Sequence, residues 1–111
     1  MGIEICKDSL KAISDTMYVI GGKWKLPIVF ALSFGEMRYK DIEEAVEGIS
    51  PRMLSKELKE LEMNKIVNRA EDPNTKYKVL YSLTDHGESL KPVFENLKEW
   101  GIFHKKKILH S

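Results

Sequence analysis

The chain has 111 residues and a formal net charge of +1, with 42% hydrophobic and 32% charged residues. A chain of this length forms one compact domain, and this balance of apolar and charged residues argues against disorder. We find no apolar stretch long enough to cross a membrane, no secretion signal and a single cysteine. We therefore expect a single domain over residues 1–111, in the cytoplasm, without an intrachain disulfide.

Two helices are predicted in the first third of the chain. Apolar residues recur at helical spacing over residues 7–20 and stop before a Gly-Gly pair, which predicts an amphipathic helix. Residues 24–32 are apolar almost all round, which is typical of a buried helix. Pro27 fits only in the first turn of that second helix, where its missing N–H group costs nothing.

The next two helices show the pattern of a helix-turn-helix over residues 38–64. The first of them is short and ends at Gly48. The second begins with Ser50 as its N-cap and Pro51 at its first helical position, and it runs to about residue 64. Its inward stripe consists of Leu54, Leu58 and Leu61. Burial of each leucine contributes roughly 1.5–3 kcal/mol, so this stripe fixes which face of the helix points outward.

A β-hairpin is predicted over residues 65–83, directly after the helix-turn-helix. Residues 66–70 form a candidate strand, and residues 72–75 are a cluster of turn-forming residues. Residues 77–83 alternate between apolar and polar side chains, as in a half-buried strand. A two-stranded hairpin at this position is the wing of a winged helix-turn-helix.

The last helix is predicted over residues 85–108, with Thr84 as its N-cap and Pro92 as a kink or an interruption. The predicted fold class is therefore α+β: a winged helix-turn-helix with a two-stranded β wing and with dimerisation helices at both ends of the chain. One small domain cannot cover the apolar stripes of both terminal helices, so we expect a homodimer. The residues expected at its interface are Leu10, Ile13, Met17, Leu97 and Trp100.

A cationic face is predicted on the second helix of the helix-turn-helix. Arg52, Ser55, Lys56 and Lys59 are spaced by three, four and seven positions and so share one side of the helix. Arginine can donate two hydrogen bonds to a guanine edge, and lysines contact phosphates. The remaining DNA-binding candidates lie at the start of the helix-turn-helix, at the start of its second helix and in the wing: Arg38, Ser50, Pro51, Arg69, Asn74, Lys76 and Lys78.

Other functions are weighed against this one. A Lys/Arg stripe on a single helix is usually only a solvated face, but here it coincides with a capped second helix and a basic wing. The alternative is a winged-helix module for protein–protein assembly without DNA binding, which would tend to carry apolar residues on this face. No nucleophile–base pair, phosphate loop or metal-ligand spacing is visible, so we expect no enzyme, no cofactor and no metal site.

The sequence resembles the HxlR-type regulators of the MarR-like superfamily over about residues 20–104. The matching blocks occur in the order found in that family: residues 20–25 (IGGKWK), 38–42 (RYKDI), 48–55 (GISPRMLS), 58–62 (LKELE), 81–87 (YSLTDHG) and 100–101 (WG). The resemblance implies a dimeric winged helix-turn-helix transcription factor whose first and last helices form the dimer interface. It thus implies sequence-specific binding of double-stranded operator DNA with a pseudo-palindromic site. The sequence assigns neither a membrane partner nor a small effector.

Cys6 has two interpretations. In part of the resembled family an N-terminal cysteine senses oxidants or electrophiles through an intersubunit or mixed disulfide. Many members of that family carry an N-terminal Cys-Pro pair that lies closer to the Gly-Gly pair than Cys6 does. Here Lys7 follows Cys6, which lies fifteen positions before Gly21. Lys7 and a nearby helix N-terminus favour the thiolate, whereas Asp8 opposes it. Cys6 is therefore either a redox sensor or a structural cysteine of ordinary reactivity.

Overall fold

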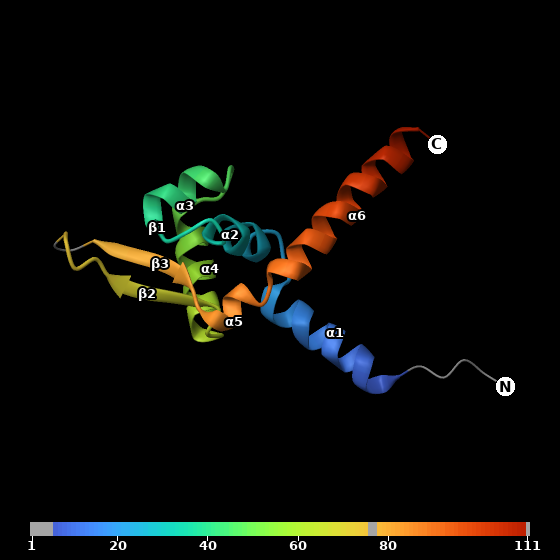
Figure 1. Ribbon diagram of the computed structural model, residues 1–111, viewed down its shortest axis with the longest axis horizontal. Coiled ribbons are helices and arrows are strands. Elements are labelled where there is room, and N and C mark those ends of the chain that lie inside the picture. Colours follow the sequence, from blue (N-terminus) through green and yellow to red (C-terminus); the bar gives the residue numbers. More distant parts are fainter. Residues whose placement is uncertain (1–5, 76–77, 111) are drawn as a thin grey trace.

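The computed structural model describes residues 6–75 and 78–110. In chain order its elements are α1 (Lys7–Ile20), α2 (Lys25–Leu32), β1 (Met37–Arg38), α3 (Tyr39–Ala45), α4 (Pro51–Met63), β2 (Val67–Glu71), β3 (Val79–Leu83), α5 (Asp85–Glu88) and α6 (Lys91–Leu109). Helices α2 to α5 and the sheet form a compact head, from which α1 and α6 project (Figure 1). The fold is a winged helix-turn-helix of the α+β class, with α3 and α4 as the helix-turn-helix.

The helix boundaries follow the predicted caps. The Ser50 hydroxyl accepts a hydrogen bond from the Met53 N–H at 3.1 Å, and Pro51 occupies the first position of α4. The Thr84 hydroxyl accepts from the Gly87 N–H at 2.9 Å and so caps α5. Pro92 lies in the first turn of α6, which begins as a separate helix after α5. The predicted interruption of the last helix is confirmed.

The wing is the predicted two-stranded hairpin, β2–β3, and a third antiparallel strand completes a sheet in the order β1-β3-β2. Strands β2 and β3 pair from Val67 opposite Leu83 to Glu71 opposite Val79. The additional strand, β1, pairs with the other edge of β3 through two residues only. A strand of two residues is too short to show an alternating pattern, which is why the sequence did not indicate it.

The hydrophobic core lies in the head. It consists of Ile20, Ile28, Val29, Leu32, Ile42, Val46, Ile49, Leu54, Leu58, Leu61, Ile66, Val67 and Phe94. The inward stripe predicted for α4 is confirmed, since its three leucines are at most 2% exposed. Helix α5 packs tightly against Ile66, the residue before β2. This packing requires a glycine at position 87, because a Cβ there would lie 2.2 Å from the Ile66 carbonyl oxygen. The core therefore fixes α4 and the sheet relative to each other.

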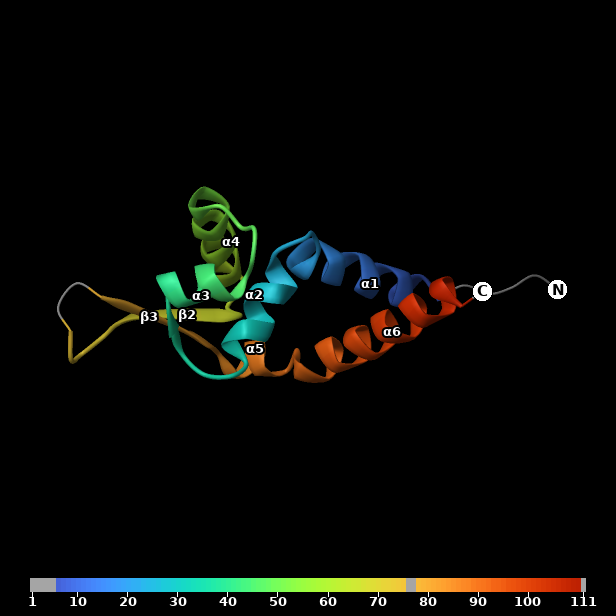
Figure 2. The same cartoon turned by 90° about the horizontal axis from the view of Figure 1, so that it is seen from above.

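Helices α1 and α6 form two arms that leave the head at the end opposite the wing tip (Figures 1 and 2). The molecule is accordingly elongated, with extents of 65 × 36 × 23 Å. Each arm contributes a single buried residue at its base, Ile20 from α1 and Phe94 from α6. None of the described helices combines the length and the apolar character needed to span a bilayer.

Candidate nucleic-acid interface

The predicted contact residues of α4 share one exposed surface. The leucine stripe faces the core, so the opposite side of the helix points to solvent. The exposed residues there are Ser50, Pro51, Arg52, Ser55, Lys56 and Lys59. This surface carries three cations and two hydroxyls beside the N-terminus of the helix, where free N–H groups favour anions. It is thus suited to a polyanion rather than to an apolar protein partner.

Tyr39 fixes the first turn of α4 from the neighbouring helix. Its hydroxyl donates a hydrogen bond of 2.6 Å to the Pro51 carbonyl oxygen and lies 3.0 Å from the Ser55 Oγ. Because the phenol has one proton, Ser55 is the donor in the second contact. The Ser55 hydroxyl therefore retains only its acceptor capacity for a ligand. Sequence periodicity gave no signal for this contact between α3 and α4.

Arg69 of the wing lies beside the exposed surface of α4. Ser55, Leu58, Lys59 and Glu62 of α4 line a hollow of about 340 Å³ together with Arg69 and Tyr81 from the sheet. The structure thus brings a predicted wing residue and two predicted helix residues to the walls of one groove. Two of the three are cations, and they outnumber the single carboxylate of the groove, that of Glu62, so the groove suits a phosphate backbone.

The start of α3 and the wing border a second hollow of about 400 Å³. Its cationic residues are Arg38, Lys40 and Lys78. Lys40 is exposed and was not among the predicted contacts, because a single lysine in a short helix has no distinguishing pattern. The predicted contact Lys76 and the predicted strand start at Tyr77 lie outside the described residues.

Two residues of this region are held by Asp72. The Arg38 Nη2 atom lies 3.0 Å from the Asp72 Oδ2, and the Asn74 backbone N–H donates a hydrogen bond of 2.9 Å to the Asp72 Oδ1. The Asn74 N–H group, followed by the Arg38 guanidinium, holds the pKa of Asp72 below its ordinary value. Asp72 is therefore a carboxylate at neutral pH, placed between two predicted DNA-binding residues.

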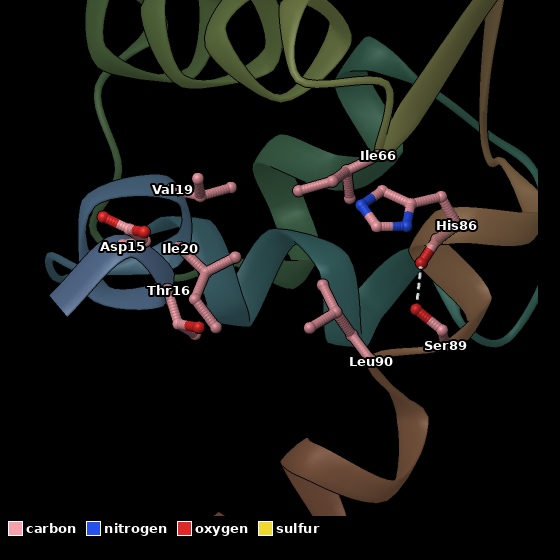
Figure 3. Close-up of a pocket in the computed structure, with 8 residues that line it drawn as sticks. All are labelled: Asp15, Thr16, Val19, Ile20, Ile66, His86, Ser89 and Leu90. Atoms are coloured by element: carbon pink, nitrogen blue, oxygen red, sulfur yellow. Dashed lines mark hydrogen bonds between the residues drawn. The ribbon is translucent and has the colours of Figure 1, made fainter. Parts of the chain in front are cut away.

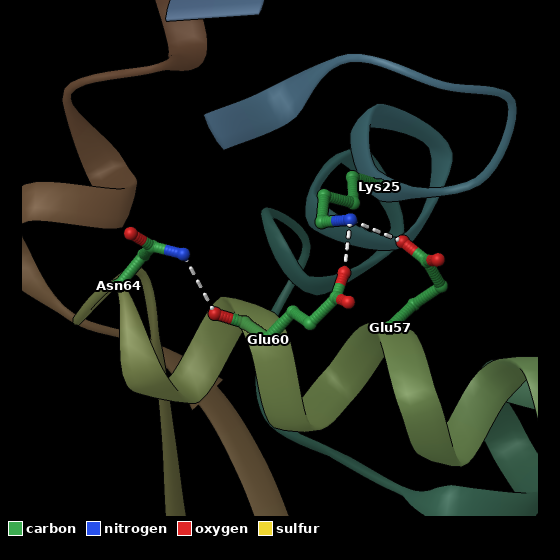
Figure 4. Close-up of polar contacts among 4 residues, drawn as sticks. All are labelled: Lys25, Glu57, Glu60 and Asn64. Atoms are coloured by element: carbon green, nitrogen blue, oxygen red, sulfur yellow. Dashed lines mark hydrogen bonds and ion pairs between the residues drawn. The ribbon is translucent and has the colours of Figure 1, made fainter. Parts of the chain in front are cut away.

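Two of the three acids of α4, Glu57 and Glu60, are directed away from its exposed cationic surface, whereas Glu62 is exposed and lines the groove with Lys59 and Arg69. Lys25 of α2 lies 2.7 Å from the Glu57 Oε2 and 2.5 Å from the Glu60 Oε2 (Figure 4). Burial by itself lowers the pKa of Lys25, but the hydrogen bonds to both glutamates outweigh it and raise the pKa above the ordinary value. This cluster neutralises one charge of α4 and connects the helix to α2.

A further hollow of about 260 Å³ separates the base of α1 from α5 (Figure 3). Val19, Ile20, Ile66 and Leu90 form its apolar walls. Of the hydroxyls at its rim, that of Thr16 donates to the Ala12 carbonyl oxygen, and that of Ser89 donates to the His86 carbonyl oxygen. These hydroxyl protons are therefore already used by the protein, and the hollow offers mainly apolar contact.

Cys6 is exposed and is the N-cap residue of α1. Hydrogen bonds from the Ser9 side chain, the Ser9 backbone and the Asp8 backbone hold the pKa of the Cys6 thiol below its ordinary value. A lowered pKa increases the thiolate fraction, which is the reactive form.

Among the described residues, no group of three or more His, Cys, Asp or Glu side chains could hold a metal ion.

Comparisons with known proteins agree with this geometry. Residues 19–108 match the family model described as HxlR-like helix-turn-helix. An uncharacterised HTH-type transcriptional regulator from Halalkalibacterium halodurans is 40% identical over 92% of this chain and 96% of its own length. The HTH-type transcriptional regulator YodB from Bacillus subtilis is 39% identical over 90% of this chain and 86% of its own length.

Solved structures extend the likeness to three dimensions. The redox regulator HypR in its reduced form superposes with a TM-score of 0.81 at 34% identity, and it covers 90% of this chain and 99% of its own. The reduced form of YodB from B. subtilis superposes with a TM-score of 0.71 at 38% identity, covering 87% of this chain and 91% of its own. The arrangement of α3, α4 and wing described above thus matches that of regulators.

Proposed function

This chain belongs to the HxlR-like helix-turn-helix family of transcriptional regulators, and from that premise we propose that it binds a pseudo-palindromic operator as a homodimer. The family and its relatives are regulators rather than enzymes. In the proposed complex α4 enters the major groove and the β2–β3 wing contacts the adjacent backbone or minor groove. Such a role also places the protein in the cytoplasm.

The observation that carries the proposal is the mainly cationic surface that runs from α4 to the wing across the groove that also contains Glu62. Arg52, Lys56 and Lys59 are exposed on α4, and Arg69 lies across a groove from Lys59. On this proposal Arg52 reads a base edge, whereas the lysines contact phosphates. Lys78 and Asn74 extend the surface along the wing, and the sequence places Lys76 between them.

The homodimer is supported by the apolar surfaces of the two arms. Leu10, Ile13 and Met17 of α1 are 54–63% exposed, and Leu97 and Trp100 of α6 are 50% and 61% exposed. A second copy that packs its arms against these stripes removes both from water. A two-fold dimer then places its α4 helices about 34 Å apart, so half-sites lie about ten base pairs apart.

We further propose that Cys6 makes the regulator responsive to oxidants or electrophiles. Solved relatives include HypR in an oxidised form and YodB in quinone-bound and diamide-treated forms. In this chain Cys6 is exposed at the start of α1, and its thiol has a lowered pKa. Addition of its thiolate to a quinone ring forms one C–S bond, and the ring is reduced to the hydroquinone as it takes up a proton. Two Cys6 thiols oxidised by diamide would instead form an intersubunit disulfide while diamide is reduced to its hydrazine.

Selection of bound fragments from the host genome tests the DNA-binding proposal and supplies an operator duplex. With this duplex we expect Arg52→Ala to weaken binding by about 1–3 kcal/mol and to relax the preference at one base pair. The control is Lys105→Ala, which removes a cation from the exposed surface of α6 and should leave the affinity unchanged. Operator binding by Arg52→Ala that equals that of the control would show that the contact face is misassigned.

A further inference from the structure

Arg38 and Asp72 join two parts of the head that are distant in sequence. Arg38 ends β1 and is the N-cap residue of α3, whereas Asp72 follows the last residue of β2. The guanidinium Nη2 and the carboxylate Oδ2 lie 3.0 Å apart. The Asp72 side chain is 9% exposed and that of Arg38 is 40% exposed, so the carboxylate is the shielded partner. The pair therefore connects the base of the wing turn to the helix-turn-helix.

Asp72 also organises the wing turn. The Asp72 Oδ1 accepts a hydrogen bond from the Asn74 N–H. The Asp72 N–H donates a hydrogen bond of 2.8 Å to the Lys78 carbonyl oxygen, and the Asp72 carbonyl oxygen accepts one of 3.3 Å from the Thr75 N–H. One residue thus closes the turn through its backbone and binds Arg38 through its side chain. Any displacement of Asp72 from Arg38 displaces the segment that carries Asn74 and Lys78.

The core holds the start of the wing, where Val67 is buried, whereas the other residues of β2 are exposed. Strand β1 contacts β3 through two residue pairs, and an isolated two-stranded hairpin is only marginally stable in water. At the tip end of the β2–β3 ladder, the Arg38–Asp72 ion pair joins the wing to the N-cap of α3. Phosphate attraction does not explain this pair, because the carboxylate cancels the charge of the guanidinium. The ion pair can then contribute to DNA binding only by holding the wing in position.

We propose that the Arg38–Asp72 ion pair sets the position of the wing relative to α4, which makes Asp72 a positioning residue for DNA binding despite its negative charge. The inference rests on the proposed function. Arg38 then acts through the wing rather than as a free phosphate contact, while Lys40 and Lys78 of the same hollow remain available to contact phosphates. Loss of either partner should widen the range of wing positions and weaken the bound state.

The proposal is tested by whether one substitution raises or lowers the affinity for DNA. Removal of an acid near DNA ordinarily strengthens binding, because phosphate repulsion is lost. We expect the opposite for Asp72→Asn: affinity for the selected operator duplex, measured by fluorescence anisotropy, should fall by about fivefold to fiftyfold. The affinity of Arg38→Met for the same duplex should fall by a similar factor. The double variant should bind no more weakly than either single variant. The matched control is Glu71→Gln, which removes the exposed acid next to Asp72 and should bind as well as or better than the wild type.

A measurement without DNA separates positioning from direct contact. In Arg38→Met the amide hydrogen of Asp72, which donates to the Lys78 carbonyl oxygen, should exchange faster than in wild type, while amides within α4 keep their protection. Tighter operator binding by Asp72→Asn, with unchanged amide exchange in Arg38→Met, would overturn the proposal and leave the DNA-binding function intact. Failure of the wild type to bind any genomic fragment would instead refute the proposed function.

Discussion

Substitution of Lys25 by methionine should lower the free energy of unfolding by about 3–5 kcal/mol, because it leaves a buried carboxylate without its cation. The Glu57 side chain is 9% exposed and lies 2.7 Å from the Lys25 ammonium, so water cannot replace that partner. Glu60 loses the same partner, but its side chain is 40% exposed and can be solvated. Methionine has a similar volume to lysine, so the loss should come from Glu57 rather than from a cavity.

Urea unfolding followed by circular dichroism measures this loss. With a slope of about 1–3 kcal/mol per molar urea, the unfolding midpoint of Lys25→Met should fall by at least about 1 M at pH 7.5.

In the wild type, the stabilisation from the Lys25 cluster has an upper and a lower pH limit. The pKa of Lys25 is raised above 10.5, so the stabilisation that it provides is present below that pH and is lost as the pH rises through the raised pKa. The hydrogen bond from Lys25 lowers the pKa of Glu60 below 4.5, so this contribution is present above pH 4.5 and is lost as the pH falls through the lowered pKa. Wild-type stability should accordingly change little between these limits on account of the cluster.

Two further variants separate the buried cluster from an ordinary ion pair. Lys91→Met breaks the ion pair with Glu88, in which the Lys91 side chain is 48% exposed and that of Glu88 is 43% exposed. This substitution should lower the free energy of unfolding by less than about 1 kcal/mol. Combining Lys25→Met with Glu57→Met removes the uncompensated charge and should restore most of the lost stability. Equal urea midpoints for Lys25→Met and Lys91→Met would refute this account of how α2 and α4 are held together.

The remaining predictions concern the arms. Trp100→Lys should convert the dimer to a monomer in sedimentation experiments at micromolar concentration, whereas Met63→Lys, which changes a 72% exposed apolar residue outside the arms, should not. A wild-type monomer at this concentration would contradict the proposed interface. Treatment with diamide or a quinone should change operator binding by wild type but not by Cys6→Ser. If the wild type keeps full affinity after modification of its thiol has been verified, Cys6 is not a switch.

Sequence reasoning predicted those features of the fold that depend on local chemistry. The caps at Ser50 and Thr84 and the leucine stripe of α4 are encoded within a few neighbouring positions, and the structure contains all of them. Pro92 likewise separates α5 from α6 for a local steric reason. The exposed face of α4 followed directly, because the side opposite a buried stripe must face solvent.

Contacts between distant residues could not be predicted in the same way. Asp72 lies thirty-four positions after Arg38, and nothing in the turn sequence indicates its partner. Lys25 occurs within an apolar segment, and the only available signal was the pair of glutamates at i and i+3 on the inner side of α4. Such pairs depend on how α2, α3 and the sheet pack around α4, and hydrophobic periodicity carries no information about that packing.

On the proposed homodimer, the arm helices make folding and assembly interdependent. Helix α1 has 14 residues and buries only Ile20, and helices of this length are marginal in water without tertiary contacts. On the proposed dimer, the second copy supplies those contacts, so arm helicity depends on protein concentration. Below the dimer dissociation constant, the amount of binding-competent protein then rises with the square of the chain concentration. Operator occupancy in the cell would respond to expression level with a threshold, and small changes in synthesis of the regulator would produce larger changes at its promoter.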